Sequence, residues 1–505
     1  MKLNKYNFIN LFANLKFLYL ILFFWCFILR FPYIFIDEIA ADENIFFILG
    51  DLILKNELPH DNYWDIKPAL VWYIYSIPIF FFKHVVIIRL FGIIIIFLSA
   101  FFLFKIVYKI ERNKFLAFVS SFLFIFASTF IGTELPNHSI GIGVNIITQH
   151  FANFFLIISI FFLFKNNSNI NIFLVCFFFS LAILVRYNYA LISLGYFYYY
   201  CTEKKQIKFF IIFSLTFFFS FLIIHCSYFT ITRFQNLIEY FDVLEQYGSK
   251  SSFEEYIHII KKFLRFIFEP LINFKIFNTR FYLSLFFWLS GLLFFILILV
   301  KEKKRDKIFL FINCTLMTMS ILIGSPAEHY LLCVILFFSY FAAKTLDYFF
   351  LKKYRYIPII IIFISSINSI KSEYLWLGAR IINNENLNIG PGYDIYNYIN
   401  KNNLPIKNNL YLSHPILYFL TDQKPIHKLI FPTQFNAHAK TLGGFDNAPE
   451  LYKSLFKKKP RLLVFDENQW NIRANKDIYN IVKSEISENY EKIYKTRTTN
   501  LYIRR

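Results

Sequence analysis

The sequence contains little charge and few of the residues that form covalent or metal cross-links. Asp, Glu, Lys and Arg make up 17% of its 505 residues, whereas soluble globular proteins carry roughly 25%. The six cysteines form no Cys-x-x-Cys pair, and no His-x-x-x-His pair occurs. These absences argue against an ordinary soluble domain, a disulfide framework and a zinc site.

Long apolar runs occupy much of the chain, which is 57% hydrophobic. A helix that crosses a bilayer needs about 20 mostly apolar residues. The runs therefore predict a polytopic α-helical membrane protein with about 11 transmembrane helices. The candidate spans are 11–35, 84–107, 115–132, 149–165, 170–186, 188–201, 207–227, 279–300, 308–323, 327–346 and 356–371.

The net charge of +20 comes largely from short connectors between these runs, at 105–114, 202–208, 301–307 and 352–355. Basic connectors are typical of the cytoplasmic loops of membrane proteins, so we expect no nucleic-acid partner. The apolar segment 68–82 is short and is interrupted by Pro78. If it lies in the outer interface and does not cross, all four connectors face the cytoplasm, with the N-terminus inside and the C-terminus outside.

This topology predicts two domains, a transmembrane domain at 1–371 and an extracytoplasmic α/β domain at 372–505. It also places the loops 36–83 and 228–278 outside. The second loop contains "FEEYIHIIKKFLRFIF", whose apolar residues recur at the spacing of an amphipathic surface helix.

The C-terminal 372–505 region alternates helix-like and strand-like patterns, as small α/β domains do. The helix-like patterns are "YDIYNYINKN", "APELYKSLF" and "NKDIYNIVKSEIS". The strand-like patterns are "NLYLS", "RLLVFDE", "YEKIYKTR" and "NLYIRR".

Two acidic pairs, Asp37-Glu38 and Asp42-Glu43, follow the first apolar run. The periodicity of the next residues predicts an amphipathic helix over 43–55. Asp42 then has two interpretations, an N-cap of that helix or a functional carboxylate. Asp37 is either a solvated carboxylate just past the span or the functional one.

The rest of this loop reads "ELPHDNYWDIKP" and ends at Lys67-Pro68. An Asp-Glu pair, a short helix and a Lys-Pro element resemble the first outer loop of the GT-C membrane glycosyltransferases, which include protein O-mannosyltransferases, bacterial aminoarabinose transferases and related hexosyltransferases. The separation of Asp42 from Lys67 is 25 residues (67 minus 42), which matches the family layout better than the 30 residues from Asp37 (67 minus 37). His60 and Ala69 depart from the family's Tyr and second Pro.

Other segments share weaker likenesses with this family, namely "IIRLFG", "LAILVRYNYAL", "AEHYLLCVILFF" and "HPILYFLTDQKPIHKLIFP". A further Glu that the family often carries in its second outer loop has no counterpart in "NIITQHFANFF", where Gln149 and His150 stand, although Glu134 lies nearby. The role of that Glu is therefore not transferred to this chain.

The resemblance implies transfer of a sugar from a polyprenyl-phosphate donor to an acceptor hydroxyl. It implies that Asp42, with Asp37 as the fallback, is the catalytic base and that Lys67 and Arg186 bind the donor phosphate. Glu43 would support Asp42. Further substrate contacts are expected from Arg89, His329 and Tyr330, for which helix packing and interfacial hydrogen bonding are the simpler interpretations.

The sequence therefore predicts a GT-C glycosyltransferase of a bacterial inner membrane, acting in cell-envelope glycan or lipopolysaccharide modification. The alternatives are a lipid-linked oligosaccharide transporter, an O-antigen-type polymerase and a non-catalytic scaffold. The gathering of polar residues at the outer edge favours the enzyme over a transporter, whose ionisable groups lie near the midplane. The sugar, the acceptor (glycan, lipid or protein) and any divalent metal are left open, and no cofactor is implied.

Overall fold

The structure, a computed structural model of the whole chain, describes most of the sequence. It describes residues 14–37, 41–130, 147–165, 168–201, 205–225, 287–296, 304–323, 328–349, 356–440, 444–468, 470–473 and 475–505, and single residues 238, 257, 261 and 354. The amphipathic helix predicted within 228–278, Glu38 and Glu134 lie outside this set.

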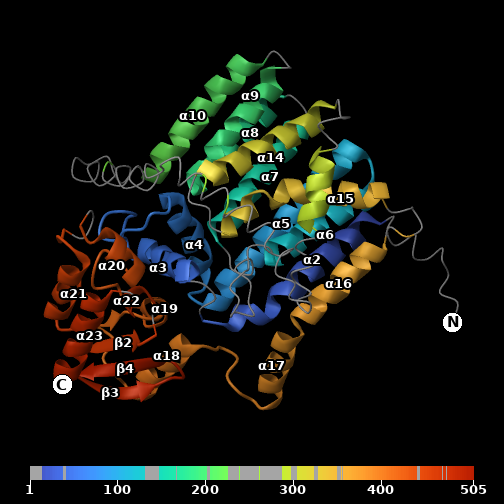
Figure 1. Cartoon of the computed structure of the whole chain (residues 1–505). Coiled ribbons are helices and arrows are strands. Elements are labelled where there is room, and N and C mark those ends of the chain that lie inside the picture. The colour runs from blue at the N-terminus through green and yellow to red at the C-terminus, as the bar shows by residue number, and fades with distance from the viewer. Residues whose placement is uncertain are drawn as a thin grey trace. The chain divides into compact units, whose positions relative to one another are not determined.

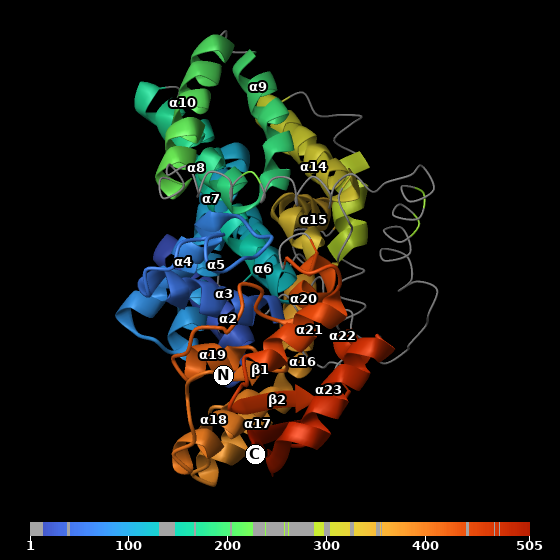
Figure 2. The ribbon, with the colours of Figure 1, turned by 90° about the vertical axis from the view of Figure 1, so that its left-hand side faces the viewer.

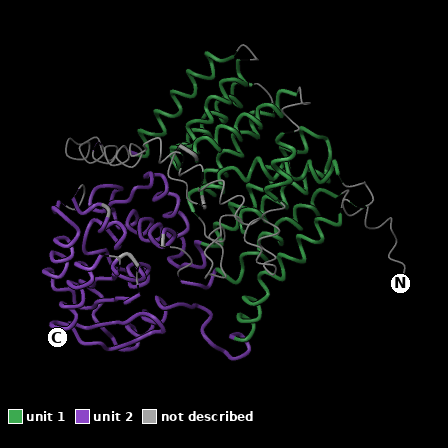
Figure 3. The backbone as a smooth tube through the Cα atoms, viewed as in Figure 1, with its two compact units in different colours: residues 1–33, 89–224, 248–379 green, residues 34–88, 225–247, 380–505 purple. Residues whose placement is uncertain are grey.

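Two compact units divide the chain, each built from separate stretches of sequence (Figure 3). Unit 1 comprises residues 1–33, 89–224 and 248–379, and unit 2 comprises 34–88, 225–247 and 380–505. The first outer loop of the prediction therefore shares a unit with most of the C-terminal region.

Unit 1 is a bundle of mostly apolar helices (Figure 1). Its described elements are α2 (Leu15–Arg30), α5 (Val85–Glu111, whose first turn belongs to unit 2), α6 (Lys114–Phe130), α7 (Thr148–Lys165), α8 (Asn169–Val185), η3 (Tyr187–Ile192), α9 (Ser193–Cys201), α10 (Gln206–His225, whose last residue belongs to unit 2), a helix at Phe287–Ile296, α14 (Arg305–Ile323), η5 (Glu328–Cys333), α15 (Ile335–Phe349), α16 (Ile357–Ser369) and α17 (Lys371–Ile382, whose end from Arg380 belongs to unit 2).

Four helices among the described residues are long and apolar enough to cross a membrane, with η1 (Phe31–Phe35) extending the first of them. They are Leu15–Phe35, Val85–Glu111, Thr148–Lys165 and Gln206–His225. The pair α16 and α17 becomes a fifth if it is counted as one span bent by 47°. The helices α6, α8 and Phe287–Ile296 are apolar but shorter. The expected total of about eleven spans stays a prediction.

Two predicted spans of unit 1 are not continuous α-helices. The segment predicted at 188–201 consists of the 3-10 helix η3 followed by the nine-residue helix α9. The segment predicted at 327–346 begins with the 3-10 helix η5 and continues as α15. Composition alone does not distinguish these from a regular helix, because 3-10 turns occur at helix ends and connections.

The first part of unit 2 consists of two helices, α3 (Ala41–Leu54) and α4 (Ala69–Phe81). They run side by side in the same direction, since Asp42 and Lys67 are paired at their starts and Asp51 and Lys83 toward their ends. Between these pairs the rings of Phe46 and Tyr75 lie 5.2 Å apart, and Gly50 lies against Tyr75 and Ser76. A Cβ at Gly50 would stand 2.8 Å from the carbonyl carbon of Tyr75, so glycine permits this close approach. With 13 residues, α4 spans about 20 Å.

The C-terminal part of unit 2 is built around a four-stranded sheet with the order β1-β2-β4-β3. The strands are β1 (Leu410–Tyr411), β2 (Leu462–Asp466), β3 (Tyr490–Lys495) and β4 (Thr499–Arg504), with β1 parallel to β2 and the other pairs antiparallel. The helices are α18 (Pro391–Lys401), α19 (Ile416–Leu420), α20 (Pro432–His438), α21 (Ala448–Lys457), α22 (Trp470–Arg473) and α23 (Lys476–Asn489). Each of the seven predicted patterns coincides with one of these elements, and α21 and α23 lie beside the sheet (Figure 2).

Asparagine caps define the starts of two of these helices. The side chain of Asn447 accepts a hydrogen bond from the backbone N–H of Glu450 at the start of α21. Asn475 accepts from the N–H groups of Asp477 and Ile478 at the start of α23. Such caps satisfy backbone donors that have no partner within the helix.

Candidate active site

An acid–base pair lies where α3 and α4 of unit 2 begin. Asp42 is the second residue of α3, and Lys67 immediately precedes Pro68, the N-cap of α4. The ammonium nitrogen Nζ of Lys67 lies 3.4 Å from Oδ2 of Asp42. The side chain of Asp42 is 44% exposed and that of Lys67 18% exposed. Solvent therefore reaches the carboxylate, while the lysine is more enclosed.

The start of α3 differs by two residues from the predicted one. The helix begins at Ala41, so Asp42 lies inside the first turn and is not the N-cap. A carboxylate in the first turn still interacts favourably with the helix dipole. Glu43, the predicted supporting residue, is fully buried in the same turn.

A second carboxylate, Asp65, lies behind Lys67. Its Oδ1 accepts the backbone N–H of Lys67 at 2.8 Å, and its Oδ2 accepts Nε2–H of Gln434 at 2.8 Å. Burial raises the pKa of Asp65 to about 6, and Asp42 adds to that effect while Lys67 and Gln434 oppose it. The sequence analysis assigned no role to Asp65 or Gln434. The Asp-x-Lys spacing is a signal for the first of these contacts, because a side chain of this kind often bonds the N–H two residues on.

The stretch that carries Lys67 is docked on the C-terminal part of unit 2. The N–H of Trp64 bonds the carbonyl of Lys428 at 2.9 Å, and the hydroxyl of Tyr63 bonds the carbonyl of Pro425 at 3.2 Å. His60 is buried, with Nε2 3.1 Å from the carbonyl oxygen of Asp65. Burial lowers the pKa of His60 to about 3, so its ring is neutral at physiological pH.

Asp37, the fallback base, occupies a different place. It is only 1% exposed, so the interpretation as a solvated carboxylate is wrong. Its Oδ2 accepts the backbone N–H of Gly392 at 2.5 Å, and its own N–H bonds the carbonyl of Ile389 at 2.7 Å. Gly390 has φ +126°, and a Cβ there would stand 1.7 Å from Oδ1 of Asp37. Asp37 thus joins the first outer loop to the start of α18, and its catalytic role stays a prediction.

Unit 1 brings two of the other predicted residues together. Arg186 caps the C-terminus of α8, and its Nη1 donates to Oγ1 of Thr148 at 2.9 Å. Its guanidinium lies 4.6 Å from the ring centroid of Tyr330, within the range of a cation–π contact. Arg89 is buried in α5 and donates through Nη1 to the carbonyl of Tyr33 at 2.8 Å.

His329 belongs to η5, and its side chain lies outside the described part of the structure. Gln149 and His150 are both buried in the first turn of α7. Within the described residues, no group of three or more His, Cys, Asp or Glu side chains is arranged to hold a metal ion.

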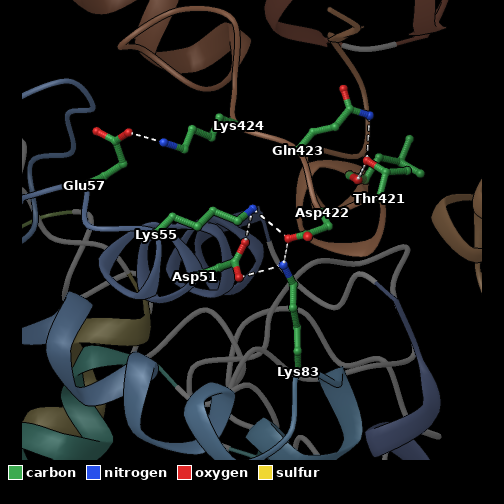
Figure 4. A network of polar contacts seen from close by, with 9 residues as sticks. Asp51, Lys55, Glu57, Lys83, Thr421, Asp422, Gln423 and Lys424 are labelled. Atoms are coloured by element: carbon green, nitrogen blue, oxygen red, sulfur yellow. Dashed lines mark hydrogen bonds and ion pairs between the residues drawn. The ribbon is translucent and has the colours of Figure 1, made fainter. Parts of the chain in front are cut away.

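A network of alternating charges holds α3 against the C-terminal part of unit 2 (Figure 4). Asp51 of α3 contacts Nζ of Lys55 at 2.8 Å and Nζ of Lys83 at 2.7 Å. Both lysines also form ion pairs with Asp422, and Nζ of Lys55 lies 2.8 Å from its Oδ1. Burial acts to lower the pKa of Lys55, but its hydrogen bonds to Asp422 and Asp51 outweigh this and raise it. Beside this network, Lys424 pairs with Glu57 (Figure 4).

The sequence matches no protein-family model and no curated protein. Comparison of the structure with solved structures, by contrast, finds similar chains over almost the whole length. ArnT from Cupriavidus metallidurans bound to undecaprenyl phosphate has a TM-score of 0.58 at 11% identity, and the match covers 99% of this chain and 98% of that one. The apo state of the same protein has a TM-score of 0.54 at 10% identity, with 98% and 97% covered.

An oligosaccharyltransferase from Archaeoglobus fulgidus, in complex with Zn and sulfate, is also similar. Its TM-score is 0.53 at 11% identity, and the match covers 96% of this chain and 73% of that one. At such low identity these likenesses establish the fold and leave the chemistry to be argued from the residues.

Proposed function

The chain has the GT-C-like fold of membrane glycosyltransferases, and on that basis we propose that it transfers a sugar from a polyprenyl-phosphate donor to an acceptor hydroxyl. The observation that carries the proposal is the Asp42–Lys67 pair, with the carboxylate and the ammonium 3.4 Å apart at the start of two helices. The similarity to a protein bound to undecaprenyl phosphate supports a lipid-linked donor.

In the proposed reaction the acceptor oxygen attacks the anomeric carbon, and the bond from that carbon to the phosphate oxygen breaks. Asp42 accepts the hydroxyl proton as the new bond forms, which contributes roughly 10²–10⁴-fold to the rate. The electron pair of the broken bond leaves with the polyprenyl phosphate. Attack from the face opposite the phosphate inverts the anomeric centre.

Lys67 changes its partner in this scheme. Before the donor binds, its ammonium faces Asp42. When the donor phosphate arrives, the ammonium pairs with the phosphate and stabilises the charge that the leaving group acquires. The carboxylate of Asp42, 44% exposed, is then available to the acceptor hydroxyl.

Arg186 and Tyr330 form the second proposed phosphate contact, on unit 1. A guanidinium offers several donors in a fixed planar arrangement that matches phosphate oxygens. Tyr330 contacts this guanidinium and is proposed as a further contact to substrate. Glu43, Arg89 and His329 remain proposed supporting or substrate-binding residues.

The proposed setting is the outer face of a bacterial inner membrane, with the N-terminus in the cytoplasm and the 372–505 region outside. It follows from the basic connectors and the positive-inside rule. The proposed role is modification of a cell-envelope glycan or lipopolysaccharide.

The test compares purified variants in lipid nanodiscs supplied with labelled polyprenyl-phosphate sugars and a membrane extract as acceptor. We expect Asp42→Asn to lose at least a hundredfold in transfer while still binding polyprenyl phosphate, and Lys67→Met to lose both binding and transfer. Asp446→Asn and Lys401→Met, two exposed residues of unit 2, are the matched controls and retain wild-type activity.

Thermal unfolding of each variant separates loss of chemistry from loss of folding. Full activity in Asp42→Asn refutes its assignment as base. Loss of activity in a folded Asp37→Asn variant alone transfers that assignment to Asp37.

A further inference from the structure

We propose that Gln434 is a positioning residue that holds the phosphate-binding Lys67 through Asp65, so that the C-terminal region forms part of the donor site. This inference rests on the proposed function of Lys67. It is carried by contacts inside unit 2 that join residues 369 positions apart in the sequence.

The amide of Gln434 has a fixed orientation. Its Oε1 accepts the backbone N–H of Ile430 at 2.7 Å, so the amide nitrogen must face the other way. That nitrogen donates to Oδ2 of Asp65 at 2.8 Å and lies 3.3 Å from the carbonyl oxygen of Trp64. Gln434 is buried in α20, where an unsatisfied amide would be costly. The side chain therefore has one low-energy arrangement, and it is directed at Asp65.

The carboxylate of Asp65 connects Gln434 to the backbone of Lys67. One of its oxygens accepts from Gln434, and the other accepts the backbone N–H of Lys67 at 2.8 Å. The next residue, Pro68, has a fixed φ of −58° and begins α4. The backbone of Lys67 is thus held on one side by Asp65 and on the other by Pro68, which sets where its ammonium can reach.

Other contacts hold the same loop independently of Gln434. Trp64 and Tyr63 bond the carbonyls of Lys428 and Pro425. A Gln434→Ala variant should therefore keep the loop docked while releasing one oxygen of Asp65. The expected consequence is a misplaced Lys67 in an otherwise folded unit.

The first experiment measures backbone amide hydrogen exchange in peptides covering residues 64–67, which needs no enzymatic activity. A hydrogen bond to a charged group contributes roughly 1.5–3 kcal/mol, so we expect the Lys67 amide to exchange roughly 10- to 100-fold faster in Gln434→Ala and in Asp65→Ala. Asp422→Asn is the matched control, because it alters a C-terminal contact of α3 that does not involve residues 64–67. Its exchange in these peptides should equal that of the wild type.

The second experiment measures transfer kinetics. Because Gln434 acts through the phosphate-binding lysine, we expect Gln434→Ala to raise the KM for the polyprenyl-phosphate donor about tenfold, with the KM for the acceptor unchanged. The variant carrying both Asp65→Asn and Gln434→Glu exchanges the amide and the carboxylate while keeping the hydrogen bond between them. Each single change should raise the KM for the donor, and the double variant should bring it most of the way back to the wild-type value. General destabilisation does not produce this result.

Wild-type exchange at the Lys67 amide in Gln434→Ala overturns the inference, and so does an equal rise in donor and acceptor KM. If the wild-type protein neither binds polyprenyl phosphate nor transfers sugar, the proposed function fails. The exchange experiment still reports whether Gln434 holds Lys67 in place.

Discussion

Replacing Asp51 with asparagine tests how strongly the charge network of Figure 4 holds α3, the helix that carries Asp42. The change keeps the shape of the side chain and removes its charge. Lys55 and Lys83 would then face each other with Asp422 as their remaining anionic partner in the network. We expect unit 2 to be destabilised, with the effect concentrated at the contact between α3 and the C-terminal part.

The expected loss in the free energy of unfolding follows from how far each side chain is exposed to solvent. The side chain of Asp51 is 6% exposed, whereas those of Lys55 and Lys83 are 20% and 31% exposed. Removing one partner of a fully buried pair costs about 3–5 kcal/mol, and the partial exposure of the lysines reduces this to about 2 kcal/mol. Asp422 is 69% exposed, so Asp422→Asn should cost only about 0–1 kcal/mol.

Thermal unfolding in detergent, followed by tryptophan fluorescence, distinguishes these values. A loss of about 2 kcal/mol corresponds to a fall in Tm of about 4–8 °C for a unit of this size. The Asp51→Asn fall should persist at high salt, since buried pairs are weakly screened. Equal Tm values for Asp51→Asn and Asp422→Asn would refute the reasoning from burial.

Two further outcomes are expected from unit 2. The raised pKa of Asp65, about 6, means that the folded state holds its proton to higher pH than the unfolded state, so this group lowers stability as pH rises from about 4 to 6. Asp65→Asn removes that loss of stability. The difference in Tm between the variant and the wild type should therefore favour the variant more at pH 7.5 than at pH 4. A difference that does not change with pH would contradict the raised pKa of Asp65. Gly390→Ala should lower Tm strongly, because its φ is +126° and a Cβ would clash with Asp37, whereas Gly378→Ala, with open space around the Cβ, should leave Tm unchanged or raise it.

Local patterns explain which elements could be predicted from the sequence. The four strands and the helices α18, α21 and α23 follow short-range periodicities, so their positions are close to those predicted. The short helices α19, α20 and α22 were not predicted. Loop spacing, compared with the family layout, selected Asp42 over Asp37 but did not predict that Asp42 and Lys67 form an ion pair. They lie close together in the structure because α3 and α4 run in the same direction from neighbouring starts.

The contacts that the sequence did not reveal are those between distant segments. One of the two interpretations of Asp37 placed it in solvent just past an apolar run, but it is buried and its partner Gly392 lies 355 positions away. The role of Gln434 depends on a partner 369 positions away. A single sequence contains no local signal for either pairing, since both depend on how the C-terminal region docks on the first outer loop.

The bond between Asp37 and Gly392 has a practical consequence for exchanging parts between chains of similar fold. Residues 36 and 389 form a parallel bridge directly beside it, so the loop and the C-terminal region are joined through both backbone and side chain. A chimaera that imports only residues 34–88 from a relative would keep Gly390, Gly392 and Gln434 but would replace their partners Asp37 and Asp65. Both stretches, 34–88 and 380–505, should therefore be taken from the same parent if a chimaera is to test the proposed donor site.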